Sequence, residues 1–116
     1  MPVEPLQAGA ARMLRAAGMH VVVSELAVAV EGSAQLETAF RQRLGEVDDY
    51  AGHVGLEVWK DDRRPGRYLQ VTWWETPAAF HSYMRSDAHR RSHARIPADP
   101  VRPTGVRVDR FSLLAT

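Results

Sequence analysis

The sequence contains no cysteine, and Lys60 is the only lysine among its 15 basic residues. The lack of cysteine excludes a disulfide framework, an iron–sulfur cluster held by thiolates and a cysteine nucleophile. With 14 acidic residues the formal net charge is only +1, so no overall basic field favours nucleic acid as a partner. No hydrophobic run is long enough to span a membrane. We therefore expect a cytoplasmic protein whose partners include neither nucleic acid nor a membrane.

The length of 116 residues is enough for one domain with a single core, and 45% hydrophobic residues is typical of globular proteins. Residues 1–18 resemble an appendage, because their Ala-, Arg- and Leu-rich stretch favours a short helix rather than a signal peptide. Met19 stands directly before the first strong strand, so 1–18 could also be an over-extended start. We predict an N-terminal extension at 1–18, either helical or disordered, and a folded domain at 19–116.

Alternation of apolar and polar residues predicts strands at 20–31, 54–59, 68–75 and 106–114. The pattern of the last strand slips in phase between Val108 and Phe111, which predicts a bulge there. The segment Asp61–Gly66 predicts a hairpin turn. Apolar residues at helical spacing predict a helix that begins at Ser33, its cap, and ends near Gly45 to Asp49. A second helix begins at Thr76-Pro77, and a further helical piece covers 88–95.

The resulting order βαββαβ predicts an α+β, ferredoxin-like fold, with an antiparallel sheet and both helices on one face. The strands nevertheless carry apolar residues on both sides. A second copy could cover the bare face of the sheet, so we expect a homodimer. The alternative is a monomer in which residues 1–18 cover that face.

Histidines gather around the second helical region. His89 and His93 are four residues apart, so on a continuous helix they share a face. Such a pair can hold a metal only with a third ligand, and the segment lacks the glutamate of the zinc-protease signature. We therefore predict no free-metal site and leave open that these are surface histidines; His81 is expected to face solvent.

Positive charge lies on the same stretch, in Arg85, Arg90, Arg91 and Arg95. These arginines could capture a carboxylate of an acidic substrate, or they could form a solvated helix face with Asp87 as a partner.

Aromatic residues are dense for a chain of this length, and they could form the core or the wall of a flat apolar pocket. They are Trp59, Tyr68, Trp73, Trp74, Phe80 and Tyr83. Glu25 lies in the middle of the first strand among Val and Ala. It is either an acid or base with a raised pKa in a pocket, or one half of a salt bridge. A register slip of one residue would decide which face it occupies.

The segment Val71-Thr72-Trp73-Trp74-Glu75-Thr76-Pro77-Ala78-Ala79-Phe80, followed by Tyr83, Ser86, His89 and His93, resembles the antibiotic biosynthesis monooxygenase domain. The resemblance covers roughly residues 19–115. It implies a ferredoxin-like protomer that dimerises through its sheets into a dimeric α+β barrel.

Within that family the sequence is most similar to the bacterial haem-degrading monooxygenases. The resemblance implies that His93 is the haem iron ligand; Tyr83 stands where those enzymes have Trp, and Glu25 where they have Asn. Another branch of the family uses no cofactor and oxidises polycyclic phenols with molecular oxygen. In that branch Glu25 or a histidine would serve as the base, with Trp74 and Tyr83 holding the rings.

The sequence therefore predicts a small monooxygenase that oxidises a flat aromatic ligand in a pocket between sheet and helices. Glu25 and His93 are the predicted catalytic residues, and Trp74, Phe80, Tyr83 and His89 are the predicted substrate-binding residues. The cofactor is none or haem. The alternatives are a non-catalytic small-molecule or haem-binding module, and a pathway cyclase or isomerase on the same fold.

Overall fold

The computed structural model describes residues 17–42, 46–94 and 103–116. The strands are β1 (His20–Ala27), β2 (His53–Lys60), β3 (Arg67–Trp74) and β4 (Thr104–Ser112). The helices are α2 (Ser33–Arg41), α3 (Pro77–Met84) and α4 (Asp87–Ala94), with short 3-10 turns η1 (Val30–Gly32) and η2 (Glu46–Asp49). Most of the predicted extension, residues 1–16, lies outside the described residues, as does most of the predicted loop before β4.

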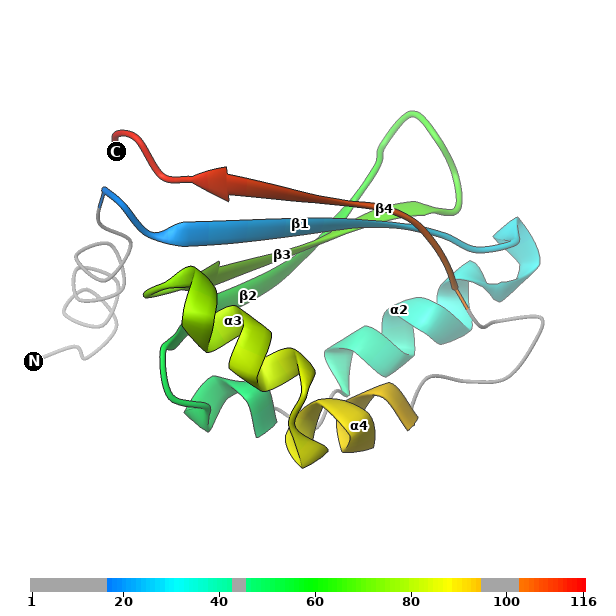
Figure 1. Ribbon diagram of the computed structural model, residues 1–116. Coiled ribbons are helices and arrows are strands. Elements are labelled where there is room, and N and C mark those ends of the chain that lie inside the picture. Colours follow the sequence, from blue (N-terminus) through cyan, green and yellow to red (C-terminus); the bar gives the residue numbers. More distant parts are fainter. Residues whose placement is uncertain (1–16, 43–45, 95–102) are drawn as a thin grey trace, which may run out of the picture.

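The four strands form one antiparallel sheet in the order β2-β3-β1-β4. The helices lie on one face of this sheet, below the strands in Figure 1. The α+β, ferredoxin-like fold predicted from the sequence is therefore confirmed. No helix in the described ranges is long and apolar enough to cross a membrane.

The β2–β3 hairpin is fixed by its turn, as predicted. One carboxylate oxygen of Asp61 accepts hydrogen bonds from the backbone N–H groups of Arg63 at 2.8 Å and Arg64 at 3.1 Å. Gly66 has φ +86°, and a Cβ atom there would lie 2.3 Å from the carbonyl oxygen of Val28. Only glycine satisfies both the backbone angle and this close approach.

The predicted cap of α3 is confirmed, and that of α2 is wrong. Thr76 Oγ1 accepts a hydrogen bond from the Ala79 N–H at 3.1 Å, and Pro77 is the first helical residue. At α2 the N-cap is Gly32 and no side chain caps it; Ser33 already has helical angles, φ −58° and ψ −45°. A residue can cap a helix with its side chain only if its own backbone is non-helical. Because η1 leads directly into α2, Ser33 is already helical and cannot act as the cap.

The bulge in β4 lies earlier than the sequence pattern indicates. The register shifts where Glu25 pairs with Arg107 and Leu26 pairs with Gly105, which leaves Val106 as the extra residue. The pattern instead placed the irregularity between Val108 and Phe111. Because β4 is an edge strand with Val106, Val108 and Phe111 all about half exposed, its apolar residues do not mark one buried face.

The core lies between the sheet and the helices and is built on Val22, Val47, Trp74, Phe80 and Tyr83. On the opposite face of the sheet, Trp59 is 48% exposed and Phe111 is 53% exposed. Within the described residues, no helix covers that face (Figure 1).

Candidate functional site

A cavity of about 600 Å³ lies between the sheet and the helices. Alternate residues of the strands form its floor, because they point toward the helices. The floor residues are Val22, Ser24, Leu26, Leu56, Val58, Gln70, Thr72 and Trp74. The helices contribute Leu36, Ala39, Phe40, Phe80, His81, Tyr83, Met84, His89 and Ser92.

Trp74 anchors the aromatic wall of the cavity. Its side chain is 1% exposed, and its indole Nε1 donates a hydrogen bond to Thr72 Oγ1 at 2.9 Å. Its ring centroid lies 5.7 Å from that of Phe80 and 5.4 Å from that of Tyr83. These separations are typical of aromatic packing, so the wall is held in one geometry before any ligand arrives.

Tyr83 connects this wall to α4. Its ring lies 5.3 Å from that of His89 and 5.2 Å from that of Tyr50, edge-on in both cases. The hydroxyl of Ser86 accepts a hydrogen bond from the His89 N–H at 3.1 Å, which starts α4 at the right place to present His89. The four predicted substrate-binding residues are therefore brought together around one cavity.

The two other histidines of this region, His81 and His93, differ in what the structure describes of them. His81 is exposed, as expected, but it also lines the cavity. His93 belongs to α4, and its side chain lies outside the described residues. Among the described residues no group of three or more His, Asp or Glu side chains is arranged to hold a metal ion.

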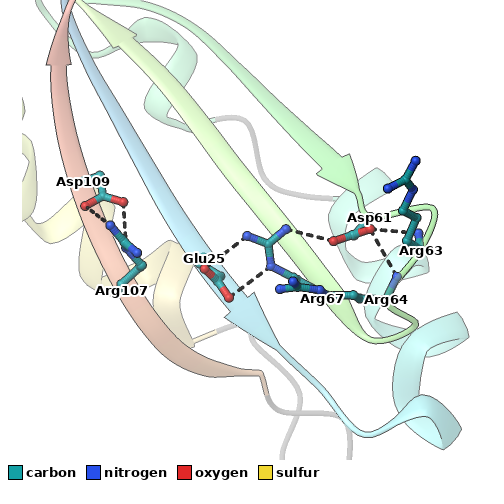
Figure 2. A network of polar contacts seen from close by, with 7 residues as sticks. All are labelled: Glu25, Asp61, Arg63, Arg64, Arg67, Arg107 and Asp109. Atoms are coloured by element: carbon teal, nitrogen blue, oxygen red, sulfur yellow. Dashed lines mark hydrogen bonds and ion pairs between the residues drawn. The ribbon is translucent and has the colours of Figure 1, made fainter.

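Glu25 lies on the face of the sheet that points away from the helices, as Figure 2 shows. The guanidinium of Arg67 contacts its carboxylate at 3.1 Å and reaches Asp61 at 2.8 Å. The hydrogen bond from Arg67, and then the charges of Arg67 and Arg107, lower the pKa of Glu25. The raised pKa and the pocket position predicted for Glu25 are therefore wrong, and the salt-bridge alternative describes this residue.

Ser24, Gln70 and Arg110 line the cavity and were missed by the sequence analysis. Ser24 and Gln70 are register partners in β1 and β3. The sequence did place Ser24 on the same face of its strand as Val22 and Leu26. That signal could not identify the cavity face, because the opposite face of the strand is equally apolar.

The arginines of the α3–α4 segment behave as the solvated alternative predicts. Arg85, Arg90 and Arg91 are exposed and none of them lines the cavity, and Arg90 pairs with Asp87. Arg95 lies outside the described residues.

A smaller pocket of about 280 Å³ lies beside the cavity between α2 and β2, and shares Phe40, Leu56 and Val58 with it. The buried Tyr68 hydroxyl donates to Glu37 at 2.5 Å, and Lys60 Nζ lies 3.0 Å from the same carboxylate. Burial, and then the hydrogen bond to Glu37, raises the pKa of Tyr68. The charges of Glu37 and Lys60 in this smaller pocket are therefore already paired with each other.

We compared the sequence and the fold with those of known proteins. The family model for antibiotic biosynthesis monooxygenase matches residues 19–95. A staphylobilin-producing haem oxygenase of Staphylococcus epidermidis is 31% identical over 78 residues, which cover 65% of this chain and 73% of that protein.

Two solved structures are similar over most of their length. The haem degrader MhuD from Mycobacterium tuberculosis, with two haems bound in its active site, has a TM-score of 0.70 and 27% identity, covering 84% of this chain and 97% of that one. SnoaB, a cofactor-independent oxygenase from Streptomyces nogalater, has a TM-score of 0.70 and 15% identity, covering 86% and 97%, and shows the fold alone. With the family match spanning most of the folded domain, this chain belongs to the antibiotic biosynthesis monooxygenase family.

Proposed function

We propose that this protein oxidises a flat aromatic ligand with molecular oxygen in the cavity between the sheet and the helices. The observation that carries the proposal is the fixed aromatic wall of Trp74, Phe80 and Tyr83 along a cavity of about 600 Å³. Such a concave, mostly apolar site with a few polar groups is suited to a small molecule with extended rings.

Haem is the first candidate ligand, since the relatives from Staphylococcus and Mycobacterium are named as haem oxygenases or haem degraders. The described cavity lining is compatible with haem, because it is mostly apolar and contains no Asp or Glu. The placement of Ser24, not Glu25, on the cavity floor leaves no ionised carboxylate of β1 facing the ligand. His93 is our proposed iron ligand, one helical turn after His89.

Haem would be the substrate in this reaction, and its iron would supply the chemistry that activates oxygen. The residues of the chain bind the haem and set its orientation. Trp74, Phe80 and Tyr83 hold the ring plane, and their burial keeps bulk water from that wall. No chemical role is proposed for Glu25.

A polycyclic phenol is the second candidate, favoured by His81 and His89 on the cavity wall. Either imidazole could take the phenolic proton and leave an electron-rich phenolate to react with oxygen without a cofactor.

The first test is a titration of the purified protein with haemin, followed by visible absorption. We expect a Soret band at stoichiometric haemin that His93→Ala removes and that Arg90→Ala retains, since Arg90 lies on the same helix but is exposed and does not line the cavity. Weak binding that is unchanged in His93→Ala would end the haem assignment and move the search to polycyclic phenols.

The second test separates an enzyme from a non-catalytic binding module or a cyclase. The protein with its bound ligand is given oxygen, with a reductant where the ligand is haem, and oxygen uptake is measured with an electrode. Consumption of ligand and oxygen together supports a monooxygenase. A ligand that binds tightly and persists without oxygen uptake contradicts it.

We also propose that the protein is a homodimer in the cytoplasm. The sheet face opposite the helices carries the half-exposed Trp59 and Phe111 as well as the Glu25–Arg67 ion pair, and this face is a suitable surface for a second copy. Sedimentation equilibrium at micromolar protein should give twice the mass of 13.0 kDa. A single species at the monomer mass would contradict the dimer.

A further inference from the structure

The cavity lining includes an arginine and a histidine that share one aromatic neighbour. Arg110 of β4 and His81 of α3 both line the cavity, and both flank Phe80. The guanidinium carbon of Arg110 lies 5.8 Å from the centroid of the Phe80 ring, and the His81 ring lies 5.4 Å from it. Within the described residues, Arg110 has no carboxylate partner, whereas Arg67, Arg90 and Arg107 are all paired with Asp or Glu.

A second histidine, His20, also contacts Phe80. His20 is 8% exposed, and its ring lies 5.9 Å from that of Phe80. Burial, and then the positive charges of Arg110 and His81, lower its pKa. An arginine that lines a cavity and has no carboxylate partner within the protein can bind an anionic group of the ligand.

We propose that Arg110, with His81 beside it, recognises a carboxylate on the flat ligand and sets the orientation of that ligand in the cavity. The inference rests on the proposed function and adds the ligand's chemical class: a planar aromatic acid whose rings contact Trp74, Phe80 and Tyr83 and whose acid group lies at the β4 edge. The arginines of the α3–α4 segment do not have this role, since none of those described lines the cavity.

The test compares each acid with a neutral analogue of the same shape, so that ring binding and acid recognition are measured separately. One pair is metal-free protoporphyrin IX and its dimethyl ester, which involves no iron ligand. The other pair is anthraquinone-2-carboxylate and its carboxamide. Dissociation constants are taken from quenching of tryptophan fluorescence. We expect the wild-type protein to prefer the acid of at least one pair by about tenfold, the value of one charge-assisted hydrogen bond.

The variants Arg110→Gln, Arg110→Lys and Arg107→Gln then locate the preference. Arg110→Gln should abolish it while leaving affinity for the neutral analogue unchanged, and Arg110→Lys should retain part of it. Arg107 is a matched control, since it lies on the same strand but pairs with Asp109 on the opposite face (Figure 2). Its replacement should preserve the preference, and melting curves check that each variant is folded.

Three results would overturn the proposal. Acid and neutral analogue could bind the wild-type protein equally, or the acid preference could persist in Arg110→Gln; in both cases the proposed function stands without this anchor. If no member of either pair binds, the cavity does not take flat ligands, and the proposed function falls as well.

Discussion

Ser24 and Glu25 are adjacent in β1, but their side chains lie on opposite faces of the sheet. Ser24 lines the cavity, and Glu25 forms an ion pair with Arg67 on the other side. Because strand side chains alternate, this single step in the sequence separates a ligand-binding position from a structural one.

The pair gives a direct test of which face binds the ligand. Ser24→Leu should weaken binding of the ligand identified in the titrations by roughly tenfold, since the larger side chain occupies cavity volume. Glu25→Gln keeps the size of the side chain and should change the affinity less than twofold. An equal loss of affinity in both variants would contradict the placement.

The Glu25–Arg67 pair predicts an acid-dependent loss of stability. The pKa of Glu25 is lowered in the folded protein, chiefly by the hydrogen bond from Arg67. A lowered pKa stabilises the fold at pH values above the ordinary pKa of the carboxyl group, and the effect disappears as pH falls through the folded-state pKa. Urea unfolding between neutral and acidic pH should therefore show a weaker pH dependence for Glu25→Gln than for the wild-type protein.

Arg67→Gln should move the pKa of Glu25 back toward its ordinary value, as measured by NMR titration of the side-chain carboxyl carbon. It removes the hydrogen bond that is the main cause of the lowered pKa. Arg107→Gln removes only a more distant charge, so its effect should be smaller. The reverse order of effects would contradict the assigned cause.

The hydrogen bond from Trp74 to Thr72 should contribute measurably to stability. Trp74→Phe leaves the buried Thr72 hydroxyl without its donor, and we expect a loss of about 1–3 kcal/mol in the free energy of unfolding. The double variant Trp74→Phe/Thr72→Val removes both partners and should lose less than the sum of the two single variants. Additive losses would mean that the hydrogen bond contributes nothing beyond packing.

The Thr76 cap should stabilise α3 by about 1 kcal/mol, because its hydroxyl satisfies the free N–H of Ala79. Thr76→Ala should lose this amount in urea denaturation, and Thr76→Ser, which keeps the hydroxyl, should retain most of it. Equal losses in the two variants would show that the methyl group, not the cap, matters.

Local chemistry determined much of the fold from the sequence alone. The Thr76-Pro77 pair fixes the start of α3, and Asp61 and Gly66 fix the β2–β3 turn, because each acts on backbone groups within a few residues. Alternation fixes where the strands run, and the order of elements restricts the topology to the ferredoxin-like arrangement. The segment 71–80 and the residues after it carry the family resemblance, and they include Trp74, Phe80, Tyr83 and His89 of the cavity wall.

Only the tertiary structure decided which face of the sheet binds. Alternation divides β1 into two faces, but both are apolar, so nothing local distinguishes Ser24 from Glu25 until the helices pack on one side. Arg110 and Phe80 are 30 positions apart in the sequence. They come into contact because β4 pairs with β1, which places Arg110 opposite Val22 in the core beside Phe80. The bulge at Val106 sets the phase of that edge strand, and an exposed edge carries no hydrophobic pattern that reveals it.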